Sequence, residues 1–96
     1  MINNLASKVT EDIYNGTNSR YARQIPHELH EKICRLFDQI DAVTQIETLR
    51  IPPSNCLEKL KGKLSDYWSL RINKRWRIIF KWDNGNAYDV EIADYH

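Results

Sequence analysis

Three side chains that can exchange protons stand together at the end of the sequence: Asp94, Tyr95 and His96. Asp94 and Tyr95 end a stretch, residues 87–95, that alternates like a β-strand, and His96 follows directly, so we expect a strand to hold the three in place. The strand-like stretch before it, residues 76–82, is rich in Arg and Lys. An acid, a phenol and an imidazole beside fixed cations suit chemistry on a phosphodiester.

Cleavage of RNA without a metal needs three roles, and the sequence offers candidates for them. A base takes the proton of the ribose 2′-hydroxyl, an acid protonates the leaving 5′-oxygen, and fixed positive charge stabilises the phosphorane. His96 and Tyr95 are the candidates for proton transfer, and Asp94 is suited to orienting the imidazole or holding an arginine. The candidates for stabilising the phosphate charge are Lys61, Arg71 and Arg77.

Each of these residues also has an ordinary structural explanation. A histidine next to a carboxylate is often a surface residue without a catalytic role, and Tyr95 can simply pack at the sheet edge. Arg77 can pair with Asp89 or Glu91 across a hairpin instead of contacting phosphate. The spacing of the residues alone leaves these alternatives open.

The net charge of +1 conceals a strongly basic stretch. Residues 57–82 contain eight Lys or Arg residues and two acidic ones, a net charge of +6, so the other seventy residues carry −5. A basic stretch on an otherwise acidic chain points to a local site for a polyanion, although a solvated sheet face is the alternative. If the stretch binds RNA, Lys59 adds another cation and Tyr67 is the aromatic residue best placed to stack on a base.

Length and composition set the class of protein. Ninety-six residues are enough for one core, and we expect residues 1–96 to form a single domain. No apolar run is long enough for a membrane and no signal peptide is visible, so we expect a cytoplasmic protein. Cys34 and Cys56 are expected to be free thiols. The sequence contains no glycine-rich phosphate loop and no metal-ligand spacing, so it implies no cofactor and no metal.

Two helices are expected in the first half of the chain. Thr10 precedes a short segment that ends at Asn15 and Gly16, which predicts a short helix capped by the threonine hydroxyl. A longer helix is predicted to begin at Pro26, a favoured first-turn residue. Its apolar residues recur at helical spacing and form one buried stripe: Leu29, Ile33, Leu36, Phe37 and Ile40.

From residue 57 onward the apolar period changes to two, which predicts strands. Asn84 and Gly85 give a strong hairpin signal before the last of them. Helices followed by such a meander predict an α+β fold, with the helices on one face of a small, mostly antiparallel sheet. The expected strands are residues 57–62, which end in a turn, 67–72, 76–82 and 87–95.

Alternation also predicts which side chains share a face of this sheet. Arg71 and Arg77 are expected to project from an open face opposite the core. The residues expected on the core face are Trp68, Leu70, Ile72, Trp76, Ile78, Phe80, Trp82, Tyr88, Val90 and Ile92.

The order of these elements and motifs closely resembles the HigB-type toxins of the RelE superfamily. The resemblance covers nearly the whole chain. The motifs that carry it are Pro52-Pro53-Ser54-Asn55, Leu60-Lys61-Gly62, Tyr67 to Asn73, Trp76-Arg77-Ile78 and Asp94-Tyr95-His96.

The resemblance implies a RelE-type fold and a toxin of a bacterial type II toxin–antitoxin pair. Such toxins enter the ribosomal A site and cut mRNA during translation, without a metal. A cognate antitoxin neutralises them, usually a helix-turn-helix, HigA-like protein that also binds its own operator DNA. The expected partners are therefore the ribosome, mRNA and the antitoxin, with operator DNA reached through the antitoxin and no membrane involved.

The resemblance also assigns residues. In some relatives a histidine stands where this chain has Glu58; a carboxylate can serve as a base but repels phosphate, so a slow toxin is compatible with the sequence. The residues that match the cleavage and RNA-binding motifs of the family are Lys61, Arg77, Asp94, Tyr95 and His96.

Two other functions fit the same basic stretch. The chain could bind the ribosome or RNA and block translation without cutting. It could instead act mainly as a regulatory partner of a DNA-binding antitoxin.

Overall fold

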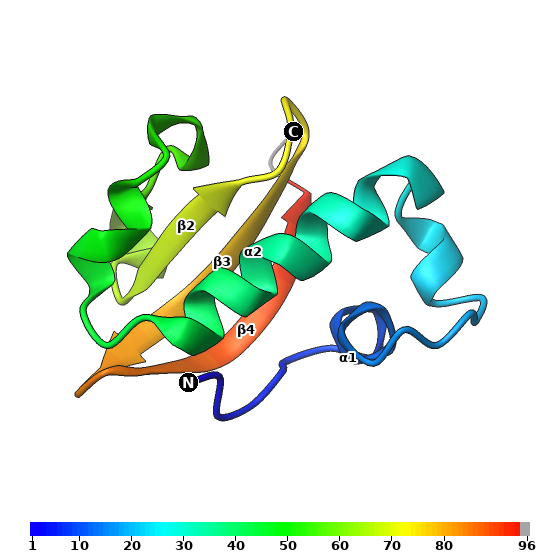
Figure 1. Cartoon of the computed structure of the whole chain (residues 1–96), viewed down its shortest axis with the longest axis horizontal. Helices are drawn as coiled ribbons and strands as arrows, with labels where there is room; N and C mark the ends of the chain where they lie inside the picture. The colour runs from blue at the N-terminus through cyan, green and yellow to red at the C-terminus, as the bar shows by residue number, and fades with distance from the viewer. Residues whose placement is uncertain (95–96) are drawn as a thin grey trace.

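The computed structural model describes residues 1–94, which form two layers, with helices on one face of an antiparallel sheet (Figure 1). The helices are α1 (Lys8–Tyr14) and α2 (His30–Ala42). The strands, paired in chain order, are β1 (Glu58–Lys59), β2 (Tyr67–Arg71), β3 (Trp76–Asp83) and β4 (Asn86–Asp94). Short 3₁₀ helices lie in the connections: η1 (Ala22–Gln24), η2 (His27–Leu29), η3 (Ile46–Arg50), η4 (Pro53–Asn55) and η5 (Gly62–Leu64). The predicted α+β class is confirmed.

The hydrophobic core lies between α2 and the sheet, which α2 crosses diagonally (Figure 1). Four residues of the predicted helical stripe, Ile33, Leu36, Phe37 and Ile40, are buried in α2, whereas Leu29 is half-buried in η2. Each fully buried side chain of this kind contributes about 1.5–3 kcal/mol when removed from water. Burial on this scale makes the sheet a rigid platform for its opposite face. The fully buried residues of the two layers include Ile33, Phe37, Ile40, Leu70, Ile78, Phe80 and Val90.

The chain before α1 runs parallel to β4 and extends the sheet at that edge (Figure 1). The N–H of Asn3 donates to the carbonyl of Ala87 over 2.8 Å, and the N–H of Val90 donates to the carbonyl of Asn4 over 3.1 Å. These main-chain bonds tie the two ends of the described chain together. Over residues 1–94, none of the helices is long and apolar enough to cross a membrane.

α1 begins earlier than the sequence predicted. Ser7 is the N-cap, and its hydroxyl accepts a hydrogen bond from the N–H of Thr10. The Thr10 hydroxyl is buried and instead accepts the N–H of Ile92 in β4 over 3.0 Å. A threonine can cap a helix, and the sequence could not show that the Thr10 hydroxyl binds the sheet instead.

α2 begins later than predicted, at His30. Pro26 opens the 3₁₀ helix η2, which leads directly into α2. Tight turns of this kind are common at helix starts, so the proline marks the first turn but not the first α-helical residue.

The predicted turn between β3 and β4 is present, and a second tight turn joins β2 to β3. Asn84 and Gly85 both have positive φ, 50° and 82°, as a two-residue hairpin between β3 and β4 requires. In the turn between β2 and β3, the side-chain oxygen of Asn73 accepts the N–H groups of Arg75 and Trp76, both over 2.8 Å.

β4 contains a bulge that the sequence alternation did not reveal. Ile79 pairs with Glu91 and Lys81 with Tyr88, so β4 has one more residue than β3 between these pairs. Asp89 lies in this bulge with φ 51°, a left-handed conformation that is uncommon for a residue other than glycine.

Before the bulge, the side chains of β4 face the opposite sides of the sheet from those that the alternation predicted. Tyr88 was expected on the core face, and this prediction is wrong. Ala87 takes that place, fully buried and paired with Trp82, whereas Tyr88 pairs with Lys81 on the opposite face. We call the face turned away from α2 the outer face, defined by Glu58, Tyr67, Ser69, Arg71, Arg77, Ile79, Lys81, Tyr88 and Glu91.

Candidate active site

Arg77 is the most firmly held cation of the outer face. Its side chain lies across β2, where Nε donates to the hydroxyl of Ser69 over 3.0 Å. One Nη donates to the main-chain carbonyl of Cys56 over 2.8 Å, just before β1. Hydrogen bonds from a charged group contribute about 1.5–3 kcal/mol each. The guanidinium is therefore fixed in position before any substrate arrives.

The expectation that Arg77 stands on an open surface is wrong. The residue is only 9% exposed. It is buried because the guanidinium lies along the sheet, between β2 and the chain entering β1, where Ser69 and Cys56 replace the hydrogen bonds of water. Cys56 presents its carbonyl from a left-handed backbone conformation, φ 48°.

Glu58 lies next to this guanidinium. Its carboxylate is 3.6 Å from the nearest Arg77 nitrogen, and its side chain is 55% exposed against 10% for the arginine. The register explains the contact, because Glu58 pairs with Ser69 and so shares the outer face with it. Of the partners suggested by the sequence for Arg77, Asp89 pairs with Lys81 instead, over 3.4 Å.

Lys61 and Arg71 each lie next to one member of this pair. Lys61 lines a small surface pocket together with Glu58 and is exposed at the start of η5. Arg71 is the direct cross-strand neighbour of Arg77 and is also exposed. Of the three predicted cations, Arg77 contacts the Glu58 carboxylate, Lys61 shares a pocket lining with it, and Arg71 is the neighbour of Arg77.

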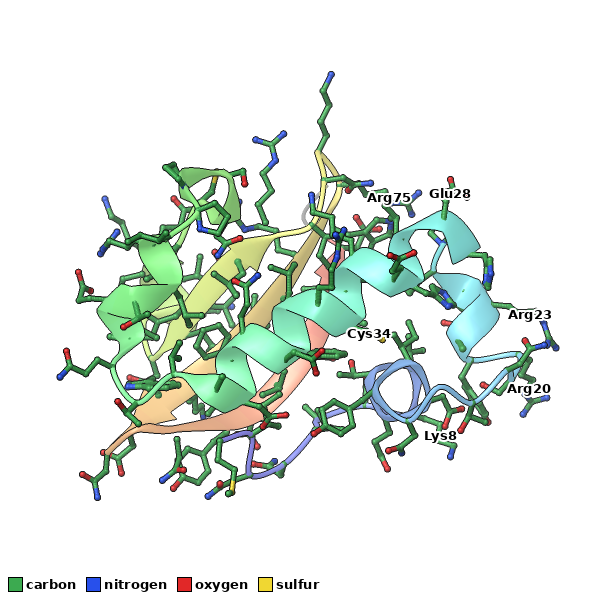
Figure 2. The ribbon with its side chains drawn as sticks, in the orientation of Figure 1. Lys8, Arg20, Arg23, Glu28, Cys34 and Arg75 are labelled. Atoms are coloured by element: carbon green, nitrogen blue, oxygen red, sulfur yellow. The ribbon has the colours of Figure 1, made fainter. Side chains whose placement is uncertain are left out.

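Asp94 is held by a different arginine. Its Oδ2 accepts hydrogen bonds from Nε and one Nη of Arg75, over 3.1 and 2.9 Å. This bond raises the pKa of Arg75, whose guanidinium also lies 4.8 Å from the centre of the Trp76 ring. Figure 2 shows Arg75 at the turn between β2 and β3, and β4 brings Asp94 there by pairing it with Trp76. Tyr95 and His96 lie outside the described residues.

Lys59 and Tyr67 fall on opposite faces of the sheet. Lys59 pairs with Trp68 in β2, and its ammonium lies 5.4 Å from the centre of that ring, so alternation separates it from Arg77. Tyr67 shares the outer face with Arg77, and the ammonium of Lys81 lies 5.3 Å from its ring. Within residues 1–94, no group of three His, Cys, Asp or Glu side chains is arranged to hold a metal.

The sequence of the chain matches a family of known toxins. Residues 3–96 match the model of HigB, described as a RelE-like toxin of a type II toxin–antitoxin system. The chain belongs to the HigB-like toxins. The family predicted from the motifs is therefore confirmed.

Two curated relatives carry the HigB name. The chain is 40% identical over 68 residues to Toxin HigB-1 of Vibrio cholerae, a match that covers 71% of this chain and 72% of the relative. It is 35% identical over 72 residues to Endoribonuclease HigB of Proteus vulgaris, covering 75% and 77%.

Solved structures of toxin–antitoxin complexes share the fold of this HigB-like toxin. A heterotetrameric YoeB–YefM complex from Staphylococcus aureus contains a chain with TM-score 0.62 and 25% identity, covering 100% of this chain and 95% of that one. A second YoeB–YefM complex from the same species gives TM-score 0.58 and 28% identity. The predicted RelE-type fold is confirmed.

Sequence reasoning missed how the HigB-like toxin positions its arginines. Ser69 and the Cys56 carbonyl, which hold Arg77, were not among the candidates, and neither was Arg75, which holds Asp94. Arg75 could have been found from the sequence. The last two strands form an antiparallel hairpin, so the residues just before the first of them lie near the end of the second.

Proposed function

We propose that this HigB-like toxin is an endoribonuclease that cuts mRNA on the ribosome, with its active site on the outer face around Arg77. The observation that carries the proposal is the contact between an exposed carboxylate, Glu58, and a buried, prefixed guanidinium. A base and a phosphate-binding cation side by side are what attack by a ribose 2′-hydroxyl requires.

Glu58 is the proposed general base. Its carboxylate takes the proton of the 2′-hydroxyl, and the resulting 2′-oxygen attacks the adjacent phosphorus. The repulsion between a carboxylate and a phosphate is offset by Arg77, which lies against both groups in this arrangement. Glu58 can therefore replace the histidine found at this position in some relatives.

Arg77, Arg71 and Lys61 are the proposed phosphate ligands. Arg77 meets the developing charge without reorganisation, since its other donors are already bonded to Ser69 and Cys56. Arg71 and Lys61 are exposed and free to follow the RNA backbone.

His96 and Tyr95 are the proposed proton donors. One of them protonates the 5′-oxygen as its bond to phosphorus breaks, which leaves a 2′,3′-cyclic phosphate and a 5′-hydroxyl. Asp94 supports them by fixing the end of β4 through its ion pair with Arg75. The scheme balances protons with side chains alone.

The remaining parts of the proposal follow from family membership. The ribosome orients mRNA against these few groups, so the isolated toxin cleaves free RNA poorly. The toxin acts in the bacterial cytoplasm. A helix-turn-helix, HigA-like antitoxin neutralises it, and the pair binds operator DNA through the antitoxin.

Mapping of transcript ends tests the proposal. The toxin is induced alone, with its antitoxin, and as the variants Glu58→Gln and His96→Ala, with Arg23→Ala as a control outside the site. Wild type and Arg23→Ala are expected to produce new ends inside coding regions, which the antitoxin suppresses. Glu58→Gln should cut about 10²–10⁴-fold more slowly, and His96→Ala should abolish growth arrest while folding stays intact.

If transcripts stay intact during growth arrest, the cleavage proposal is wrong, and the toxin instead blocks translation without cutting mRNA. Full toxicity of both variants would show that the proton-transfer assignments are wrong. An effect confined to operator binding would identify a regulatory partner instead.

A further inference from the structure

Tyr67, Lys81 and Tyr88 form one row across the outer face. They are direct neighbours in the register, on β2, β3 and β4 respectively. The adjacent row contains Ser69, which Arg77 contacts, and Ile79. Successive rows on one face are two residues apart, about 7 Å. The row of Tyr67, Lys81 and Tyr88 therefore lies within reach of the nucleotide next to a phosphate held at Arg77.

Lys81 is held between an aromatic ring and a carboxylate. Its ammonium lies 5.3 Å from the centre of the Tyr67 ring and 3.4 Å from a carboxylate oxygen of Asp89. Such a cation over a ring is stabilised by the ring's electron density. Tyr67 and Lys81 therefore lie against each other, and together with Tyr88 they form what we call the platform.

The bulge in β4 supplies the carboxylate of this platform. Asp89 is in a left-handed conformation, and the side-chain amide of Asn4 binds it twice. The Asn4 Nδ2 donates to the Asp89 carboxylate over 2.7 Å, and the Asn4 Oδ1 accepts the Asp89 N–H over 3.0 Å. Bulges commonly redirect a side chain beside a functional site. Here the bulge turns Tyr88 onto the outer face and aims Asp89 at Lys81.

The charge around the platform decides what it can bind. Lys81 and Tyr88 line an open pocket that also reaches Lys59 and Trp82, which belong to the other face of the sheet, and two aspartates, Asp66 and Asp83. Two lysines against two aspartates leave no excess positive charge for a phosphate. Aromatic rings in a nearly neutral pocket suit an uncharged nucleobase, which stacks on them.

We propose that Tyr67, Lys81 and Tyr88 form a nucleobase-binding subsite that stacks the base of a nucleotide beside the cleaved phosphate. The inference rests on the proposed function for the position of the phosphate. The chemical group recognised is the flat face of the base, so the subsite positions the RNA chain and contributes affinity.

Binding of a short RNA with and without its bases tests the subsite. The probe is a 2′-O-methyl tetranucleotide, which cannot be cleaved, titrated into full-length toxin while tryptophan fluorescence is recorded. Versions with one abasic position each identify the base that is bound. Tyr67→Ala should weaken binding of the complete probe by about 5- to 150-fold, the loss expected for one stacked base. Tyr67→Phe, which keeps the ring, should bind like wild type.

Tyr21→Ala is the matched control, because Tyr21 also has a cation over its ring, Arg20 at 5.0 Å, but lies beside η1. It should bind the probe normally. For one of the abasic probes, the affinity for wild type should be as low as the affinity of the complete probe for Tyr67→Ala. The affinity of that abasic probe should be the same for Tyr67→Ala as for wild type. If Tyr67→Ala lowers the affinity for the complete probe and for every abasic probe by the same factor, the inference is overturned. It is also overturned if a folded Tyr67→Ala binds the complete probe as well as wild type does.

The outcome is separable from that of the proposed function. If transcripts stay intact but the base-dependent loss is seen, the subsite stands and the cleavage proposal fails. If cleavage occurs but base and abasic probes bind alike, the subsite fails alone.

Discussion

Arg75, in the turn before β3, and Arg77, in β3, are two residues apart, yet the molecule holds them in opposite ways. Arg77 is buried and donates to a hydroxyl and a main-chain carbonyl. Arg75 is 58% exposed at its side chain and is held by the carboxylate of Asp94. The first is fixed by the fold, whereas the second is fixed by a charge that salt and protons can weaken.

This difference separates two demands of the proposed chemistry. A cation that must meet a transition state gains from a position set in advance, because no reorganisation is then needed. A group that only anchors the end of β4 can rely on a weaker, solvent-exposed bond. Substitutions at the two arginines should therefore differ in both size and kind.

The largest effect is expected for Arg77→Ala. Cleavage on the ribosome should fall by about 10²–10³-fold, because the phosphate loses its prefixed donor. The free energy of unfolding should also fall by about 1–3 kcal/mol, since Ser69 and the Cys56 carbonyl lose their partner. Transcript-end mapping and urea denaturation measure the two losses. A variant that loses activity without any loss of stability would argue against the structural half of this assignment.

Replacement of each arginine by lysine sharpens the comparison. Arg77→Lys keeps the charge but has one nitrogen in place of the two that bond Ser69 and Cys56 separately, so cleavage should drop by about tenfold or more. Arg75→Lys can still pair with Asp94, so its rate should stay close to that of wild type. Rates measured side by side on programmed ribosomes decide this, and equal losses in the two variants would remove the distinction drawn between the sites.

A smaller effect is expected for Arg75→Ala. Cleavage should slow by no more than about fivefold, because exposed ion pairs contribute little. The difference in unfolding midpoint between this variant and wild type should shrink in high salt, which screens the pair. A difference that persists unchanged at 1 M NaCl, about a 3 Å screening length, would mean that Arg75 acts through packing on Trp76 instead.

The smallest effect is expected at a carboxylate on the helical side, Asp12. A hydrogen bond from the Ser19 hydroxyl, over 2.6 Å, and the nearby Lys8 lower the pKa of Asp12. The stability that this carboxylate contributes is present above the ordinary aspartate pKa, about 3.9, and is lost as the pH falls through its lower folded-state pKa.

In Ser19→Ala the folded-state pKa should rise toward the ordinary value, so stability should depend less on pH in the acid range. Urea denaturation between neutral and acid pH measures this, with Ser65→Ala as a control far from Asp12. If wild type and Ser19→Ala show the same acid dependence, the hydrogen bond does not set the pKa of Asp12.

Much of the fold could be predicted because its signals are local. The apolar stripe of α2 and the Asn84–Gly85 hairpin each depend on residues close in sequence, and both are confirmed. The side chain of Tyr88 was placed on the wrong face because the bulge at Asp89 is stabilised by Asn4, which lies 85 residues away. A single alternating pattern cannot reveal such a partner.

The candidate site was predicted in its residue types but not in its arrangement. Alternation placed Arg77 on the correct face, but its burial depends on the path of the chain before β1, which no periodicity encodes. Glu58 was noted as a departure from the family, and its contact with Arg77 follows only from the register of β1. The roles of Tyr95 and His96 stay predictions.

The carbonyl of Cys56 binds Arg77 from the main chain, not from a side chain. Any amino acid at position 56 carries the same oxygen, so this hydrogen bond does not need the cysteine side chain. What must be kept is the left-handed turn of the backbone, which glycine and asparagine adopt most easily. Substitutions that keep this backbone conformation can therefore leave the position of the Arg77 guanidinium unchanged. A β-branched residue at position 56 would move the carbonyl that holds it.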